Sequence, residues 1–482
     1  MSLVWPVALA AGALLGALAC GKPEPPVNVL FVSFDSLRAD HLHAYGYERE
    51  TSPSLDRLAA GGVLFENAIS ETSWTLPSHL TLLTGLTSRV HGVTYDGRRL
   101  SEAHTTLAES LREVGYRTEA FVSAPYLHPI FGFDQGFERY EVLGSTIYDE
   151  EDFSPRRLAN PEWQERASEA DIASHQMRSS EVLAELVEEA VARLAGEPFF
   201  LFVHMFDPHY DYDPPEAYWR RFNPDYAGDF EGRGYTRNPR VEPGMPSEDL
   251  EQIVALYDGE IRYTDEHFGR MLEALERAGL TEQTLVVATS DHGEEFFEHG
   301  RKGHRATLFD EQLRVPLILR LPGGLPEGKR LAMQVRAIDV LPTILELLGV
   351  AAPAEAMGRS LVPYALGLAT PEDLPAVSFL DRPRRLRLTA LRTGSTKLLV
   401  LRSHERPGKV ISRLFDLAAD PTERRPERKG ALLHQELRAL AEFERQEAAA
   451  RKRLAAPPEP VAQPDAMRKS LEALGYIETP EP

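Results

Sequence analysis

The chain has 482 residues, a formal net charge of −21 and 43% hydrophobic residues. This composition is ordinary for a folded protein and excludes wholesale disorder. Single hydrophobic cores stop growing at roughly 250–300 residues, so we expect one large domain and a smaller one. Because phosphate contacts need clustered Lys and Arg, the acidic excess argues against a nucleic-acid backbone as the main partner.

The N-terminus carries an uncharged apolar stretch, Leu3–Ala19, directly before the only cysteine, Cys20. A membrane-spanning helix needs about 20 residues, whereas this stretch is shorter and ends in small residues, as export signals do. Ala17-Leu18-Ala19-Cys20 resembles the lipobox of bacterial lipoproteins. We therefore predict cleavage before Cys20 and an exported lipoprotein, periplasmic or at the cell surface, with a lipid anchor in the membrane. An uncleaved N-terminal anchor is the alternative.

From residue 27 the chain alternates apolar strands with amphipathic helices. Val29–Val32 is an almost continuous apolar run, which is typical of a strand buried on both faces of a parallel sheet. Pro53–Ala60 is predicted as a helix, with Ser52 as its N-cap. Further expected strands are Glu119–Ser123, Phe199–Phe206, Leu285–Thr289 and Pro316–Arg320, and further expected helices are Ser247–Ala278 and Val340–Leu348. This alternation predicts an α/β fold with a mostly parallel central sheet and helices on both faces.

The pattern changes after residue 365. Short apolar runs at Val377–Leu380, Leu386–Thr393 and Lys397–Leu401 precede a helical pattern at Ala431–Leu454, which indicates a smaller antiparallel sheet with a covering helix. The predicted divisions are an export signal at 1–20, a Pro-rich spacer at 21–26, a large domain at 27–365, a C-terminal α+β subdomain at 366–455, and a Pro-rich linker and tail at 456–482.

Acidic residues and histidines follow three of the expected strands. Asp35 follows the first strand, His209 follows the strand that ends near residue 206, and Asp291 and His292 follow the strand that ends near residue 289. Open α/β sheets bind ligands at the carboxyl ends of their strands, so these side chains are expected at one edge of the sheet. Carboxylates and an imidazole make up divalent cation sites. Taken alone, Asp35 is equally well explained as a loop carboxylate that caps the next turn.

A hydroxyl-rich segment, Thr72–Ser78, leads into a Leu-rich helix. Capping alone would explain it, because Ser and Thr are preferred N-cap residues. However, a helix N-terminus also receives anions, through its free N–H groups and the helix dipole. A hydroxyl group that lies there beside a metal can be deprotonated and act as a nucleophile.

Together these stretches resemble the sulfatases of the alkaline phosphatase superfamily, in the same order along the chain. The matching motifs are Asp35–Asp40, Tyr45–Tyr47, Thr51–Leu58, Thr75–Gly85, His91-Gly92, Leu111–Ala120, Asp207-Pro208-His209, Ser290–Glu294, Arg314–Pro316, Asp339–Thr343, Phe415–Leu417 and Asp420–Glu423. The resemblance implies the fold of that superfamily, with a smaller C-terminal antiparallel sheet and helix, and it implies hydrolysis of sulfuric or phosphoric esters.

Residue by residue, the resemblance implies a metal site and a set of catalytic side chains. The implied metal ligands are Asp35, Asp291 and His292. Thr75 occupies the nucleophile position and His209 matches the histidine near the leaving group. His304 falls about where the family places a Lys or His that touches the transferred group, and Lys302 is the competing candidate for that role.

Two departures from the usual sulfatase pattern change the expected chemistry. Typical sulfatases carry Cys or Ser at the nucleophile position, which becomes formylglycine, followed by x-Pro-Ser-Arg. Here the slot reads Thr75-Leu76-Pro77-Ser78-His79, and because threonine cannot be converted, no formylglycine is expected. Ser36 stands where a second aspartate often follows the first metal ligand. These departures make the site resemble the threonine-nucleophile phosphodiesterases and phosphotransferases of the superfamily. The expected cofactor is therefore a divalent metal, Ca, Mg, Mn or Zn.

The predicted function is a metal-dependent hydrolase that cleaves sulfuric, phosphoric or phosphonic esters through a covalent Thr75 intermediate, with phosphoesters preferred. The expected substrate is a small-molecule ester or one linked to a glycan or lipid. The alternatives are a sulfatase that works without formylglycine, a transferase of phospho-groups, and an inactive binding lipoprotein. Transferase relatives usually have several transmembrane helices, and the intact site residues argue against an inactive protein.

Overall fold

The computed structural model describes residues 27–143 and 179–461, except 231, 233, 234, 236, 237, 383, 384, 407 and 428, together with residues 463 and 468. The predicted export signal, the spacer and most of the predicted tail lie outside these residues. Within the described ranges, none of the helices combines the length and the apolar character needed to cross a membrane.

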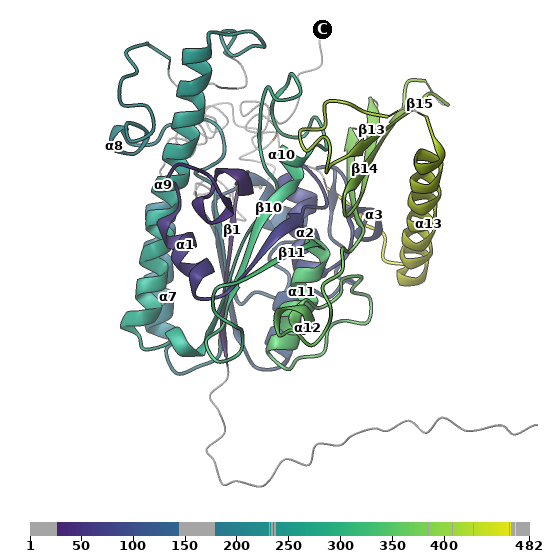
Figure 1. The fold of residues 1–482 in the computed structure, drawn as a ribbon. Coiled ribbons are helices and arrows are strands. Elements are labelled where there is room, and N and C mark those ends of the chain that lie inside the picture. Colours follow the sequence, from purple (N-terminus) through teal and green to yellow (C-terminus); the bar gives the residue numbers. More distant parts are fainter. Residues whose placement is uncertain are drawn as a thin grey trace, which may run out of the picture.

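An eight-stranded sheet forms the centre of the large domain, in the order β11-β2-β10-β7-β1-β6-β4-β5 (Figure 1). Its strands are β1 (Asn28–Phe34), β2 (Val63–Ile69), β4 (Arg117–Val122), β5 (Arg139–Val142), β6 (Phe199–Met205), β7 (Thr284–Ser290), β10 (Arg314–Arg320) and β11 (Lys329–Arg336). β1 pairs in parallel with both β6 and β7, whereas β10 runs antiparallel to both of its neighbours. The predicted mostly parallel sheet is confirmed, although the prediction did not include β2, β5 and β11.

Helices cover both faces of this sheet, so its central strands are buried throughout (Figure 1). β1 shows the reason, because its side chains alternate between two apolar cores: Val29 and Phe31 belong to one, and Leu30 and Val32 to the other. The first core contains α2 (Thr75–Thr84), α4 (Leu107–Glu113), α11 (Val340–Leu347) and α12 (Val362–Ala365), and the second contains α1 (Pro53–Ala60), α7 (Ser179–Leu194) and α9 (Ser247–Arg277). Shorter elements are α3 (Ser88–His91), α8 (Glu216–Trp219), α10 (Asp310–Leu313), β3 (Arg98–Arg99), β8 (Glu295–Phe296), β9 (Lys302–Gly303) and β16 (Glu459–Pro460).

Helix α1 begins and ends where the sequence predicts, but its N-terminus is capped differently. The hydroxyl of Ser52 donates to Asp56 at 3.2 Å instead of accepting from the helix backbone. The free N–H groups of Ser54 and Leu55 donate to Asp265 of α9, both at 2.8 Å. Ser52 is thus the N-cap residue, as predicted, but the carboxylate of Asp265, and not the Ser52 side chain, satisfies those donors.

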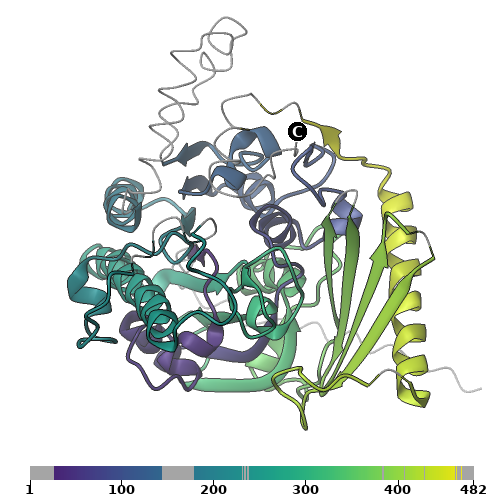
Figure 2. The ribbon, with the colours of Figure 1, turned by 90° about the horizontal axis from the view of Figure 1, so that it is seen from above.

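The smaller sheet contains β12 (Ala376–Arg382), β13 (Leu386–Thr393), β14 (Thr396–Ser403) and β15 (Val410–Asp416), each antiparallel to the next. Helix α13 (Ala431–Leu454) lies along it, with Leu433 and Leu440 in a shared apolar cluster (Figure 2). This confirms the predicted C-terminal sheet and helix, although β15 was not among the predicted strands. Lys397 of β14 ties the sheet to the large domain, because its buried ammonium group pairs with Asp310 at 2.7 Å.

Candidate active site

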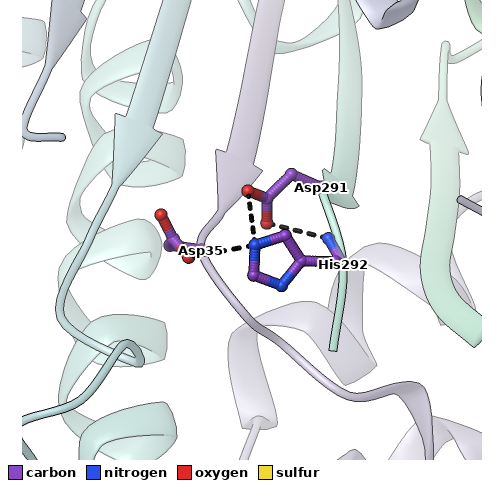
Figure 3. A group of neighbouring side chains, drawn as sticks. All are labelled: Asp35, Asp291 and His292. Carbon is purple, nitrogen blue, oxygen red and sulfur yellow. Dashed lines mark hydrogen bonds and ion pairs between the residues drawn. The ribbon is translucent and has the colours of Figure 1, made fainter. Parts of the chain in front are cut away.

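The carboxyl ends of β1 and β7 bring together Asp35, Asp291 and His292 (Figure 3). β1 ends one residue before Asp35, and β7 ends one residue before Asp291. Because the two strands are adjacent and parallel, their next residues meet at the same edge of the sheet. All three side chains are buried, and their ligand atoms lie within 4.8 Å of one another.

The hydrogen bonds of this cluster fit a divalent cation. His292 donates from Nδ1 to the carbonyl of Gly293 at 2.9 Å, so the lone pair of Nε2 points toward the carboxylates. Nε2 lies 3.3 Å from Oδ2 of Asp291 and 3.9 Å from Oδ1 of Asp35. Oδ2 of Asp291 is buried and accepts no hydrogen bond from the described residues. Burial also raises the pKa of Asp35 to about 6, despite the nearby His292. Acceptor atoms of the three side chains thus face one another with no donor between them. A metal ion can satisfy such an arrangement.

Ser36 holds the two carboxylates in place. Its hydroxyl donates to Oδ1 of Asp35 at 2.7 Å, and its N–H donates to Oδ1 of Asp291 at 3.1 Å. The backbone of Ser36 has φ of 55°, a left-handed conformation that costs free energy for a residue with a Cβ. Residues in such conformations are found mostly at functional sites. Ser36 therefore orients both carboxylates without adding a third negative charge.

Thr75 is the first residue of helix α2, and its side chain points to the cluster of Asp35, Asp291 and His292. Oγ1 lies 3.3 Å from Nε2 of His292 and 3.5 Å from Oδ2 of Asp35. The N-cap position belongs to Trp74, and no side chain caps this helix. Capping therefore does not explain the hydroxyl of Thr75, which lies where a nucleophile next to a bound metal would be needed.

His79 lies one turn further along α2 and is uncharged. Nδ1 donates to the carbonyl of Thr75 at 2.9 Å, and Nε2 accepts from the hydroxyl of Ser33 at 2.8 Å. Burial lowers the pKa of His79 to about 3, with a further decrease caused by His204. The position where the usual sulfatase motif has an arginine thus contains a neutral, fully hydrogen-bonded imidazole.

The sequence analysis missed His204, which lies inside strand β6. Its Nε2 donates to Oδ2 of Asp35 at 3.2 Å, and burial lowers the pKa of its imidazole to about 4. A polar residue within the apolar run Phe199–Met205 was the signal for it. In the register of β1 and β6, His204 pairs with Ser33, two residues before Asp35, which is why it reaches the cluster.

The structure brings His304 next to His292, and His209 next to His304. The ring centroid of His304 lies 4.4 Å from that of His292 and 4.9 Å from that of His209. Nδ1 of His304 lies 3.3 Å from Oε1 of Glu294, which the sequence analysis did not include among the site residues. Burial raises the pKa of Glu294 well above its usual range, so its environment favours the protonated acid. These side chains can exchange protons beside the metal cluster.

Lys302 points elsewhere. Its ammonium group donates to the backbone carbonyls of Tyr235 at 2.9 Å and Val241 at 2.8 Å. These bonds connect Tyr235 and Val241 to strand β9. Of the two alternatives for the group that touches the transferred ester, the geometry therefore favours His304.

Asp207 also has a structural role. Its carboxylate accepts from the N–H groups of Ser179 at 2.9 Å and Ser180 at 2.8 Å, so it caps the first turn of α7 as that helix is described. A carboxylate at a helix N-terminus is favoured by the helix dipole. We therefore do not include Asp207 among the metal ligands.

Arg305 is a second residue that the sequence analysis missed. It lies directly after His304, with φ of 61°. Its guanidinium carbon lies 4.0 Å from the ring centroid of Trp74, the residue before Thr75, and its Nη1 donates to the hydroxyl of Tyr126 at 3.3 Å. A permanent positive charge therefore lies beside the N-terminus of α2.

A second group of metal-type side chains comprises Glu295, His299 and Glu311, and the hydrogen bonds of its histidine indicate a different role. Nδ1 of His299 donates to Glu311 at 2.6 Å, and Nε2 donates to the carbonyl of Thr422 at 3.1 Å. Since both partners are acceptors, both ring nitrogens carry hydrogen and the ring is an imidazolium. Burial lowers the pKa of His299, but the hydrogen bond and charge of Glu311 outweigh it, and the pKa is raised.

We expect this imidazolium to make stability depend on pH. The pKa in the folded state lies above the unfolded value of about 6.5, so the stabilisation is complete below that pH and is lost as the pH rises through the folded value. The difference in Tm between wild type and His299→Gln should therefore shrink as the pH rises from about 6 to about 9. His434→Gln, at an exposed histidine of α13, should show no such trend. A pH-independent difference for His299→Gln would contradict this assignment.

Comparison with known proteins identifies the family. The profile of the Sulfatase family matches residues 27–350, and that of the N-sulphoglucosamine sulphohydrolase C-terminal region matches residues 298–438. The chain therefore belongs to the sulfatase family. It is an ester hydrolase of the alkaline phosphatase superfamily, and members of its family typically bind a divalent metal.

One protein is similar to this chain in sequence, and two solved structures are similar to it in fold. An arylsulfatase of Clostridium perfringens is 27% identical over 380 residues, covering 69% of this chain and 77% of the relative. A solved structure of a protein in complex with its substrate D-glucosamine-2-N,6-O-disulfate has a TM-score of 0.67 at 20% identity and covers 89% of this chain and 98% of that one. The phosphonate monoester hydrolase of Agrobacterium radiobacter has a TM-score of 0.66 at 24% identity and covers 88% of this chain and 96% of that one.

Proposed function

We propose that this sulfatase-family hydrolase cleaves sulfuric, phosphoric or phosphonic esters through a covalent intermediate on Thr75, and that it prefers phosphoric and phosphonic esters. The position of Thr75 carries the proposal. Its Oγ1 lies 3.3 Å from Nε2 of His292, at the N-terminus of a helix whose free N–H groups favour an anion. Because threonine cannot become formylglycine, the reaction proceeds without that group.

In this mechanism, Asp35, Asp291 and His292 would hold the divalent metal, which would supply a lower pKa for the adjacent hydroxyl and positive charge for the transferred group. Thr75 gives its hydroxyl proton to Oδ2 of Asp35 and attacks in line, the bond to the leaving oxygen breaks, and His304 or His209 donates a proton to the leaving alcohol. The same imidazole then takes a proton from the water that releases the group from Thr75.

The preference for phosphoesters follows from the single hydroxyl of threonine. A formylglycine hydrate has two hydroxyls on one carbon, so it can expel sulfate by collapsing to the aldehyde. Thr75 has one, so water must attack sulfur directly to clear a sulfated intermediate. A phosphorylated intermediate can be cleared at phosphorus, where positioned charges stabilise the transferring phosphoryl group.

We therefore expect kcat/KM on phosphate or phosphonate esters to exceed that on aryl sulfates by more than about tenfold, or about 1.4 kcal/mol of transition-state stabilisation. Initial rates on phosphate monoesters, phosphate diesters, phosphonate esters and aryl sulfates that share one leaving phenol, each with Ca, Mg, Mn or Zn, measure this preference. Equal or faster turnover of the aryl sulfate would overturn the preference. It would favour a sulfatase that works without formylglycine, the second candidate, which the match to the Sulfatase family supports.

We also propose that the protein is exported and carries lipid on Cys20. The support is the apolar run that ends in Ala19 and the Pro-rich spacer behind it. Mass spectrometry of the mature N-terminus should find a lipid-modified Cys20 as the first residue. An intact Met1, or cleavage elsewhere with an unmodified terminus, would contradict the proposal.

A further inference from the structure

A cavity of about 430 Å³ lies between the large domain and the smaller sheet, and none of the candidate active-site residues lines it. Its walls come from the segment that begins in α3, from strands β12 and β13, and from the end of α13. The charged side chains that line it are Arg89, Arg98, Arg387, Arg451, Asp381 and Glu447. Four guanidinium groups thus face two carboxylates in a chain whose net charge is −21.

Both carboxylates already have cationic or hydroxyl partners. Glu447 pairs with Nε of Arg89 at 3.0 Å and accepts from the hydroxyl of Thr87 at 2.6 Å. Asp381 pairs with Nη2 of Arg387 at 3.3 Å and lies 2.9 Å from Nε2 of His404. Both carboxylates of the cavity are therefore already paired with an arginine, Glu447 with Arg89 and Asp381 with Arg387.

The other two arginines have no carboxylate partner among the described residues. Arg98 donates to the hydroxyl of Tyr95 at 2.9 Å and to the carbonyl of Pro458 at 3.5 Å, and both of these acceptors are uncharged. Arg451 is exposed in the last turn of α13 and forms no ion pair with any of the described residues. The cavity thus has an excess of about two positive charges, and a concave surface focuses such a charge on small anions.

The framework holds these guanidinium groups in place. Arg98 belongs to β3, which pairs with β16. Its guanidinium carbon lies 5.8 Å from the ring centroid of Tyr95. Those of Arg89 and Arg387 lie 5.2 Å and 5.5 Å from the ring centroid of Phe379. Guanidinium groups stack on aromatic rings and present two parallel donors to sulfate, phosphate or carboxylate, so Arg98 is positioned before an anion arrives.

We propose that this cavity binds an oxyanion group, a sulfate, phosphate or carboxylate, through Arg98 and Arg451. The group comes from a free inorganic anion or from an anionic sugar chain. Asp96, two residues before Arg98, is linked to Arg305 by two hydrogen bonds, because it accepts from the hydroxyl of Tyr126 at 3.5 Å and Tyr126 accepts from Arg305. The inference does not depend on the nucleophile or the ester preference proposed above.

Isothermal titration calorimetry with sodium sulfate, sodium phosphate and a heparin-derived hexasaccharide tests the proposal. The proteins are the unsubstituted chain and its variants with Arg98→Ala, Arg451→Ala or both. Arg453→Ala is the matched control, because it removes an exposed arginine of the same helix that does not line the cavity. Each cavity variant should weaken binding at one site by roughly tenfold or more, while the control should bind as the parent does.

The two sources of the anion give different patterns. Weakened binding of the inorganic anions indicates a free anion, whereas weakened binding of the hexasaccharide alone indicates an anionic group on a sugar chain. Unchanged affinity in both arms for the Arg98→Ala, Arg451→Ala double variant would overturn the proposal. Equal weakening by Arg453→Ala would overturn it as well, because general surface charge would then explain the effect.

Discussion

Replacing Thr75 by alanine is expected to reduce kcat/KM by a factor on the order of 10⁴ or more, since removing a catalytic nucleophile has effects of that size. The physical reason is the location of the hydroxyl, 3.3 Å from His292 and 3.5 Å from Asp35, where no other described hydroxyl contacts both residues. Alanine leaves those two side chains and Asp291 in place. Metal content and far-UV circular dichroism should therefore stay close to wild type while steady-state turnover disappears.

Two further substitutions distinguish a nucleophile from a residue that only packs. Thr75→Ser keeps the hydroxyl and should retain most of the activity in a host without a formylglycine-generating enzyme. Thr75→Cys should restore turnover of aryl sulfates only in a host that contains that enzyme. If Thr75→Ala keeps more than about a tenth of the wild-type kcat/KM, the covalent intermediate lies elsewhere or does not form.

Replacing Asp291 by alanine is expected to remove most of the bound metal together with the activity. Asp291 is one of three buried candidate ligands, and its Oδ2 has no hydrogen-bond donor among the described residues to replace a cation. The remaining ligands would have to hold the ion alone, and the loss of such a contact typically weakens metal binding by at least 10–100-fold. Elemental analysis of the dialysed protein measures the loss, and circular dichroism checks that the fold persists.

The second carboxylate–histidine group supplies the control for this experiment. Glu311→Gln changes a residue of similar chemistry whose partner is the imidazolium of His299, so metal content should not fall. Asp291→Asn keeps the acceptor for the N–H of Ser36 but removes the charge, and it should lose metal as the alanine variant does. Full metal occupancy with normal turnover in Asp291→Ala would show that the metal site has been placed wrongly.

The sequence by itself determined the elements whose patterns are local. Three elements begin and end where predicted, namely helices α1 and α13 and strand β13. Their signals are the periodicity of apolar residues and, in α1, Pro at the first helical position, and these depend only on residues close together in the chain. The positions of Asp35 and Asp291 directly after buried strands likewise made their convergence predictable, since adjacent parallel strands end at the same edge of a sheet. Strand β15 was harder to predict, because Val410 and Ile411 are exposed and its apolar pattern is weak.

Only the tertiary structure decided between side chains that the sequence left equivalent. Lys302 and His304 are two residues apart, but Gly303 between them has φ of 77°, which interrupts the alternation of a strand and turns one side chain to the segment 235–241 and the other to His292. Asp265 of α9, and not the side chain of Ser52, accepts from the first free N–H groups of α1. These choices depend on contacts between residues far apart in the chain, which no local pattern encodes.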